Sequence, residues 1–203
     1  MTPCECGLAY VTTNPSDRRL HRKIHDEYLN GIPIRPSHDD QVLSDAADLR
    51  ITLVRPSASW NQRQRTKRIS RRCNREMHYD FGGVYHAMSV WEFESHAFIC
   101  AREERAIGFL LLEKHDHVWR AAWKDWKDGY SPPLISKGIP RWTLVFAWVL
   151  PPFRRQGIGR RLVDAAVAFA GIPLAEMGFY TPFSEAGEKL VRSLCPEELL
   201  IVR

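Results

Sequence analysis

Apolar residues follow two patterns along this chain, and each pattern predicts a different kind of element. Short runs rich in β-branched and aromatic residues predict strands, because such side chains fit a pleated, half-buried surface. Longer stretches with apolar residues every three or four positions predict helices. The predicted strands are residues 50–55, 96–101, 105–113, 142–150, 178–180 and 199–202, and the predicted helices are 60–79, 158–170 and 184–194. Strands alternating with helices, with one hairpin turning at 102–104, predict a mixed α/β sheet.

The chain divides into a small N-terminal unit and one larger domain. We expect a compact unit over residues 1–30, a linker rich in proline and charge over 31–48, and the main domain over 49–203. Within the main domain, residues 114–141 show neither period and are expected to be irregular.

The first long helix shows how its ends and its buried face are predicted. Ile69, Cys73 and Met77 are spaced by four and therefore share one face of a helix. Phe81-Gly82-Gly83 is expected to end this helix, because glycine is common just past a helix C-terminus.

The net charge of +5 comes from one basic segment rather than from the whole surface. Residues 61–75 hold seven basic side chains and no acid, so removing them leaves about −2 for the rest of the chain. This basic segment is either a solvated helix face or a docking face for an acidic protein or nucleic acid. It contains no aromatic residue for base stacking, which weakens the nucleic-acid interpretation.

Cysteine usage and hydropathy indicate a reducing compartment. The five cysteines are odd in number and unevenly spaced, which argues against a disulfide framework. No apolar run approaches the roughly 20 residues of a membrane span, and the N-terminus lacks the apolar stretch of a secretory signal. We therefore expect a cytosolic chain, or a nuclear one in a eukaryote, with no membrane partner.

The stretch 149–162 is the most informative part of the sequence. A buried strand leads into a basic, glycine-containing turn and then directly into a helix, with Arg154, Gly157 and Gly159 spaced as Arg-x-x-Gly-x-Gly. The first helical N–H groups have no partners within the helix, and the helix dipole adds positive charge there. A pyrophosphate fits such a site, and Arg155 and Arg160 add further charge.

The spacing of this turn separates it from other phosphate-binding loops. It matches neither Gly-x-x-x-x-Gly-Lys nor Gly-x-Gly-x-x-Gly, so a P-loop or a Rossmann site is not favoured. The turn instead resembles the pyrophosphate-binding signature of GNAT acetyltransferases, which predicts acetyl-CoA as the cosubstrate. The alternative is an ordinary strand-turn-helix connection.

A second group of residues near the N-terminus has the chemistry of a metal site. Asn14 is predicted to cap a helix on which His21 and His25 lie one turn apart, and Cys4 and Cys6 precede it. Two thiolates and two imidazoles complete a tetrahedral Zn²⁺ site of C2H2 type. The Cys-x-Cys spacing is shorter than the usual one. In the alternative interpretation the cysteines are structural and the histidines lie on a helix surface.

The two groups together resemble one family, the sister-chromatid cohesion acetyltransferases, in which a zinc finger precedes a GNAT domain. The segments that carry the resemblance are Cys6-Gly7-Leu8-Ala9-Tyr10, Asn14-Pro15-Ser16-Asp17, His21 to His25, Ala106 to Leu110, Phe146 to Leu162 and Gly178 to Pro182. The resemblance implies a GNAT fold and an acetyl-CoA-dependent N-acetyltransferase.

The resemblance also implies roles for individual residues. Ala147, Trp148 and Val149 would offer backbone groups to the pantetheine arm and the acetyl carbonyl. Arg155, Gln156, Gly157, Ile158, Gly159 and Arg160 would hold the pyrophosphate. Phe183, Ser184 and Glu185 would lie beside the cofactor, and Asp164 matches a family carboxylate implicated in catalysis.

This chain departs from the family at three places. Tyr180-Thr181-Pro182 stands where the family has Ser-Asp-Pro, so Thr181 replaces an acid; Leu8 replaces a methionine, and the first cysteine is displaced by one residue. We therefore expect a divergent member. The family's acceptor, a lysine on a cohesin subunit, is not carried over.

The expected chemistry is direct attack of an amine on the thioester, for which a base must take the amine's proton. Asp164 is the first candidate base and Glu185 the second. A strand N–H near Trp148 or Val149 would stabilise the oxyanion, and Tyr180 or Ser184 would protonate the leaving thiolate. His115 and His117 could form a second metal or base site, but we expect them in an exposed acceptor loop.

Three functions fit these observations. The first is acetylation of a protein lysine. The second is acetylation of a small molecule or of an amine linked to nucleic acid, because a fold does not choose an acceptor. The third is a non-catalytic module that docks through the finger and the basic segment.

Overall fold

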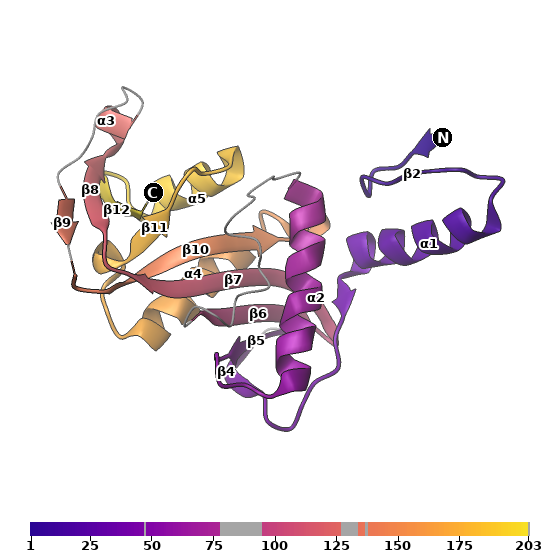
Figure 1. The fold of residues 1–203 in the computed structure, drawn as a ribbon, viewed down its shortest axis with the longest axis horizontal. Coiled ribbons are helices and arrows are strands. Elements are labelled where there is room, and N and C mark those ends of the chain that lie inside the picture. Colours follow the sequence, from indigo (N-terminus) through magenta and orange to yellow (C-terminus); the bar gives the residue numbers. More distant parts are fainter. Residues whose placement is uncertain (47, 78–94, 127–133, 137, 203) are drawn as a thin grey trace.

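The computed structural model describes residues 1–46, 48–77, 95–126, 134–136 and 138–202, and in them one mixed sheet is covered by helices on both faces (Figure 1). Its strands lie in the order β4-β5-β6-β7-β10-β11-β12-β8-β9, and β3 also pairs with β7. The bounds are β3 Ile32–Pro33, β4 Gln41–Ala46, β5 Leu49–Val54, β6 His96–Arg102, β7 Arg105–His115, β8 Val118–Ala122, β9 Leu134–Ser136, β10 Arg141–Val149, β11 Gly178–Tyr180 and β12 Glu198–Val202.

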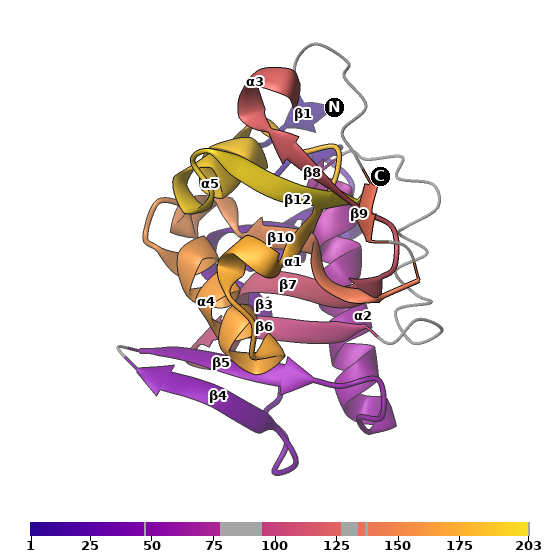
Figure 2. The same cartoon turned by 90° about the vertical axis from the view of Figure 1, so that its left-hand side faces the viewer.

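The helices form two layers that enclose the sheet. Helix α2 (Trp60–Met77) lies on one face, and α4 (Ile158–Ala170) and α5 (Glu185–Leu194) lie on the other (Figure 2). Short helices α3 (Trp123–Trp126), η1 (Pro151–Phe153) and η2 (Leu174–Glu176) complete the domain. The core between the layers is fully buried at Phe98, Phe109 and Phe179. The expected mixed α/β class is therefore confirmed.

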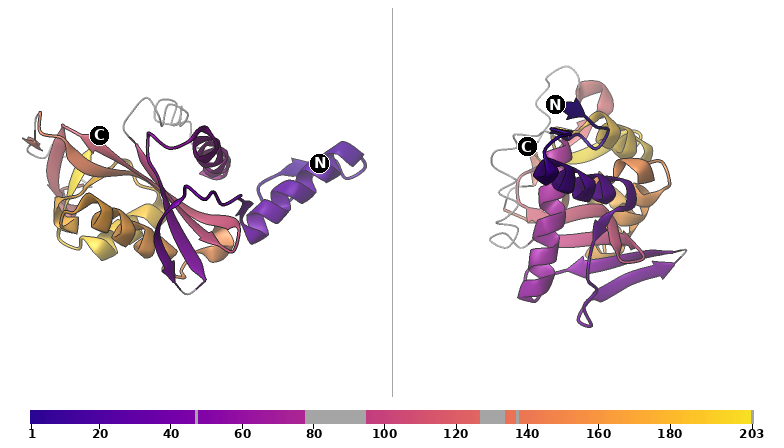
Figure 3. Two further views of the ribbon diagram at one scale, coloured as in Figure 1. Left: turned by 90° about the horizontal axis from the view of Figure 1, so that it is seen from below. Right: turned by 90° about the vertical axis from the view of Figure 1, so that its right-hand side faces the viewer.

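The N-terminal unit projects from one end of the sheet. Two short strands, β1 (Thr2–Pro3) and β2 (Ala9–Tyr10), precede helix α1 (Pro15–Asn30), which extends away from the other helices (Figure 3). The predicted cap is present, because the N–H of Ser16 donates to Oδ1 of Asn14 over 2.9 Å.

Most elements predicted from periodicity have the expected positions. Helix α4 coincides with the predicted 158–170 and ends at Gly171, whose left-handed backbone closes it by donating to the carbonyl of Val167. In α2, Ile69 and Cys73 are fully buried, as their spacing predicts. Met77 ends α2, and its side chain and the expected stop at 81–83 lie outside the described part of the chain.

Two segments differ from their predictions because strand pairing decides them. The expected linker over 31–48 contributes β3, which pairs with β7, and β4, which pairs with β5. The expected irregular segment over 114–141 contains β8, which pairs with β12, and β9. These strands are short or lie at sheet edges, where a strand needs little apolar periodicity.

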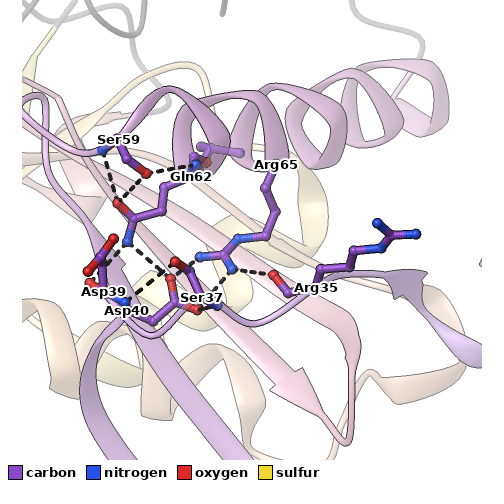
Figure 4. A network of polar contacts seen from close by, with 8 residues as sticks. Arg35, Ser37, Asp39, Asp40, Ser59, Gln62 and Arg65 are labelled. Atoms are coloured by element: carbon purple, nitrogen blue, oxygen red, sulfur yellow. Dashed lines mark hydrogen bonds and ion pairs between the residues drawn. The ribbon is translucent and has the colours of Figure 1, made fainter.

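A buried ion pair holds the segment before β4 against α2 (Figure 4). The Arg65 guanidinium donates to both carboxylate oxygens of Asp40, over 2.9 and 2.5 Å, and to the carbonyl of Arg35 over 2.8 Å. Gln62 and the amide of Ser37 also donate to Asp40. Burial by itself would raise the pKa of Asp40, but these hydrogen bonds outweigh it and hold that pKa below its usual value.

Two further observations bear on the expectations from composition. All five cysteines are free thiols, as their number and spacing predict. Among the described residues, no helix is long and apolar enough to cross a bilayer.

Candidate functional site

The central strands β10 and β11 separate after only two paired positions. Thr143 pairs with Gly178 and Leu144 with Phe179, and the rest of β10 then continues without β11 beside it. The register of β10 against β7 also shifts between Leu144 and Phe146, where a bulge increases local twist. We call the space between the diverging strands the β10–β11 gap.

Strand β10 turns unpaired backbone groups toward this gap. The amide of Leu150 donates to the carbonyl of Ile107 over 2.9 Å, so Leu150 belongs to the ladder with β7. Along an antiparallel ladder, every second residue directs its N–H toward the partner strand. The amide of Trp148 therefore also faces β7, and the amides of Ala147 and Val149 face the gap. The strand N–H groups near Trp148 that remain suitable as oxyanion donors are thus those of Ala147 and Val149.

The turn after β10 leaves the start of α4 open. Gly157 has the left-handed φ of 77° and caps α4 without any side-chain hydrogen bond. No atom comes within 4 Å of the position that a Cβ at Gly157 would occupy. The start of α4 is therefore open at Gly157, and its first N–H groups have neither a partner within the helix nor a capping side chain, which is the arrangement that binds anions at helix N-termini.

The basic side chains of the turn have different partners. Arg154 donates from Nε to the carbonyl of Val149 over 2.9 Å, which shapes the turn. Arg155 is exposed, with a φ of 64°, and Arg160 donates to Asp164 over 2.9 Å. Arg155 and Arg160 are thus on the surface beside the open helix start.

The other residues of the turn have packing roles. Gln156 donates to the carbonyl of Pro152 over 3.2 Å, and Ile158 is buried. A Cβ at Gly159 would lie 3.3 Å from Cδ2 of Leu190, so glycine here lets α5 approach α4 closely.

The two carboxylates predicted as bases lie on the surface and are already paired. The Asp164 side chain is 55% exposed and bound to Arg160, and the Glu185 side chain is 85% exposed and bound to Lys189. The pKa of Glu185 is lowered by its hydrogen bond from Lys189. Neither carboxylate has the burial that would raise its basicity.

The segment after β11 uses its hydroxyls for structure. Thr181 is buried and donates from Oγ1 to the carbonyl of Val202 over 3.1 Å. Ser184 caps α5 by accepting from the amide of Gly187 over 3.1 Å. The ring of Phe183 packs near that of Trp123, with centroids 6.1 Å apart.

Tyr180, by contrast, lies in a polar cluster that the sequence analysis did not assemble. Its ring centroid is 5.8 Å from that of His115, whose Nε2 lies 3.3 Å from Oε2 of Glu113. Ser95 donates to Oε1 of Glu113 over 2.6 Å. The only sequence signal was Glu113 and His115 two apart at the end of a strand. His117 is exposed beyond that strand and bound to Asp116, so the expectation of both histidines in an exposed loop holds for His117 alone.

The four predicted metal ligands are brought together. The ligand atoms of Cys4, Cys6, His21 and His25 all lie within 4.8 Å of one another. Cys4 Sγ is 3.3 Å from His25 Nδ1, close to the separation of about 3.5 Å that zinc–ligand bond lengths give in a tetrahedral site. Nε2 of His21 is buried with no hydrogen-bond partner. The residues therefore fit a zinc ion.

A tight turn explains how the short Cys-x-Cys spacing suffices. Gly7 has a φ of 82° and donates to the carbonyl of Cys4 over 2.9 Å, while the amide of Cys4 donates to the carbonyl of Leu8. The turn folds the chain back, so both sulfur atoms face α1.

Part of the basic segment 61–75 is used within the chain. Arg65 binds Asp40, and Arg68 donates to Glu27 of α1 over 2.8 Å. Arg72 is only 5% exposed. Together with the ion pair between Arg105 and Asp26, these contacts attach α1 to the main domain. A docking role of the remaining basic side chains stays a prediction.

Comparison with known proteins identifies the family to which a chain with this fold and this gap belongs. The sequence matches the acetyltransferase (GNAT) family over residues 60–171, which is more than half of the chain. The chain therefore belongs to the GNAT acetyltransferase family.

Particular relatives agree with the resemblance to the cohesion acetyltransferases. The chain is 27% identical to the N-acetyltransferase ESCO2 of Mus musculus over 173 residues, which are 80% of this chain and 28% of the mouse protein. It is 27% identical to the N-acetyltransferase ECO1 of Debaryomyces hansenii over 222 residues, which are 90% of this chain and 73% of that protein. The chain thus spans less than a third of its mouse relative.

A solved structure has the same fold. The xEco2 acetyltransferase domain bound to a CoA conjugate superposes with a TM-score of 0.64 at 17% identity, covering 81% of this chain and 98% of that one. The expected GNAT fold is therefore confirmed.

Proposed function

We propose that this chain transfers the acetyl group of acetyl-CoA to an amine, and that the amine belongs to a lysine of a protein. One observation carries the proposal: the unpaired amides of β10 line a gap that leads to the open N-terminus of α4. The gap suits the amide-rich pantetheine arm, and the helix start suits a pyrophosphate. Membership of the GNAT family supports the same ligand.

The residues of the gap would divide the binding between them. The amides of Ala147 and Val149 would bind the pantetheine and the carbonyl of the thioester. One such donor aimed at the developing oxyanion contributes about 3 kcal/mol to catalysis. The N–H groups that follow Gly157 would hold the pyrophosphate, with Arg155 and Arg160 as flanking charges.

The relatives support a protein lysine as the acceptor. The similar proteins ESCO2 and ECO1 are named N-acetyltransferases, and the xEco2 domain of the same fold holds a CoA conjugate. Thr181 replaces the acid of the family's Ser-Asp-Pro motif, and its hydroxyl is bound to Val202. The residue that takes the proton must therefore lie elsewhere in this chain.

A combined binding and turnover experiment tests the proposal. Calorimetry with acetyl-CoA should show one site per chain. Incubation with acetyl-CoA and a library of lysine peptides should release CoA thiol and add 42 Da to the peptides by mass spectrometry. Faster turnover of polyamines or aminoglycosides would favour a small-molecule acceptor. Binding without turnover of any amine would favour a non-catalytic module, and absence of binding would overturn the proposal.

We also propose that Cys4, Cys6, His21 and His25 hold one structural zinc ion. A unit of about 30 residues has almost no core of its own, so metal binding would supply much of its folding free energy. The ion pairs of Asp26 and Glu27 would then transmit this order to the main domain. Residues 1–30 would then form the finger and 49–203 the acetyltransferase domain, to whose sheet the segment between them adds β3 and β4. Residence in the cytosol, or in a eukaryotic nucleus, stays a prediction.

Metal analysis tests the zinc proposal without any activity assay. Protein purified without chelator should contain one zinc per chain, and His21→Ala should contain less than about a tenth of that, because one of four ligands is lost. The control is His38→Ala, whose side chain is 92% exposed and lies outside the cluster. A wild-type chain that neither retains zinc nor binds it in equilibrium dialysis would contradict the site.

A further inference from the structure

Glu113, His115 and Tyr180 meet on the α2 face of the sheet, at the root of the β10–β11 gap. Trp142 contacts Phe169 of α4, so its neighbour Thr143 must face the opposite side. Glu113 is the register partner of Thr143 and shares that face, as does His115 two residues on.

Tyr180 reaches the same face from β11. A Cβ at Gly178 would lie 2.7 Å from Oγ1 of Thr143, so Gly178 and Tyr180, two residues apart, also point toward this side. Tyr180 directly follows the last paired residue of β11 and therefore borders the gap.

The contacts of Glu113 make it an ionised carboxylate that holds an imidazole. Its side chain is 17% exposed, and burial alone would raise its pKa. The close approach of His115 and the hydrogen bond from Ser95 outweigh burial and hold the pKa of Glu113 below its usual value. Oε1 accepts from Ser95, and Nε2 of His115, which is buried with no other partner, lies 3.3 Å from Oε2; this leaves Nδ1 of His115 for another partner.

We propose that His115 is the general base of the acetyl transfer and that Glu113 is the residue that positions it. A carboxylate bound to one imidazole nitrogen fixes the tautomer that has its lone pair on the other nitrogen. His115 Nδ1 would then accept the proton of the acceptor ammonium at the root of the gap. The inference rests on the proposed function, and it names a base other than Asp164 and Glu185, which are exposed and paired.

The proton and electron balance is simple. The ammonium gives one proton to Nδ1 of His115 and becomes a neutral amine. Its nitrogen lone pair attacks the thioester carbon, so that a C–N bond forms and the C–S bond breaks. The second amine proton leaves with the sulfur as CoA thiol, and His115 returns its proton to solvent.

Other charged groups also lie near His115. Arg141 is its register partner on β10, and Asp116 follows it in the chain. Tyr180 contributes a neutral ring from β11. Among these groups, only the carboxylate of Glu113 contacts the imidazole, at 3.3 Å. Glu113 should therefore dominate the orientation of the His115 ring.

The test compares pH profiles of matched variants. In the wild type, kcat/KM should fall on the acid side as His115 becomes protonated. His115→Gln should lower kcat/KM about 100-fold at pH 7, which is the low end for loss of a general base. Its activity should recover as pH rises toward the lysine pKa of about 10.4, because the acceptor lysine then loses its proton to solvent and needs no base from the protein. Glu113→Gln should lower kcat and leave KM unchanged, because the neutral amide no longer fixes the tautomer and orientation of the His115 ring.

His117→Gln is the matched control, since that histidine is exposed and bound to Asp116. Affinity for CoA and the unfolding midpoint should be unchanged in His115→Gln, which separates catalysis from folding. An active wild type with an unchanged profile in His115→Gln would overturn the role of His115. A wild type that acetylates no amine would instead overturn the proposed function.

Discussion

Gly157→Asp should reduce the affinity for CoA by at least about 100-fold. The residue sits with a φ of 77° at the open start of α4, and a Cβ there would strain the turn. The added carboxylate would also lie where the pyrophosphate is expected, and would interact with the same N–H groups. Isothermal titration with CoA measures the change directly.

Gly171→Asp is the control for this prediction. Gly171 has a φ of 66°, and, as at Gly157, a Cβ would meet nothing within 4 Å. The two substitutions impose similar backbone strain and the same charge at opposite ends of one helix. If CoA binds equally well to both variants, the phosphate site does not lie at the start of α4 and the proposed cosubstrate is wrong.

Arg65→Met should lower the free energy of unfolding by about 3–5 kcal/mol, because it leaves the carboxylate of Asp40 buried without its partner. The two side chains are 10% and 9% exposed. For a chain of this size such a loss corresponds to a fall in Tm of roughly 10 °C. Urea unfolding followed by circular dichroism measures it.

The control is Arg50→Met, whose partner Asp45 is 54% exposed. Exposed pairs contribute about 0–1 kcal/mol, so this variant should unfold almost as the wild type does. Replacing both Arg65 and Asp40 by apolar residues should recover much of the stability, because no charge is then left buried. Equal losses in the two single variants would show that burial does not strengthen the Arg65 pair.

The same ion pair predicts a pH dependence. The pKa of Asp40 is lower in the folded chain than its ordinary value of about 3.9. Its contribution to stability is therefore complete above that value and is lost as pH falls through the folded pKa. Arg65→Met should remove most of this loss, so the stability difference from the wild type should shrink toward low pH.

Local sequence determined much of this molecule, because the relevant physics acts over a few residues. Apolar periodicity set β7, β10 and α4, and Asn14 capped α1 as its side chain predicts. The turn around Gly157 was predictable for the same reason. Its conformation depends on a glycine that can adopt a left-handed φ and on the strand that directly precedes the turn. The meeting of the four predicted zinc ligands also follows from their spacing along one turn and one helix.

Tertiary structure alone decided which strands join the sheet and which polar groups meet. β4 and β8 carry weak apolar patterns and are ordered by their pairing partners, which lie elsewhere in the chain. His115 and Tyr180 are 65 positions apart in the sequence. They meet near Glu113 only because β7 and β11 are both neighbours of β10 in the sheet. Asp164 matched a motif, but the packing of α4 against the sheet decided that its side chain is 55% exposed, and there it pairs with Arg160.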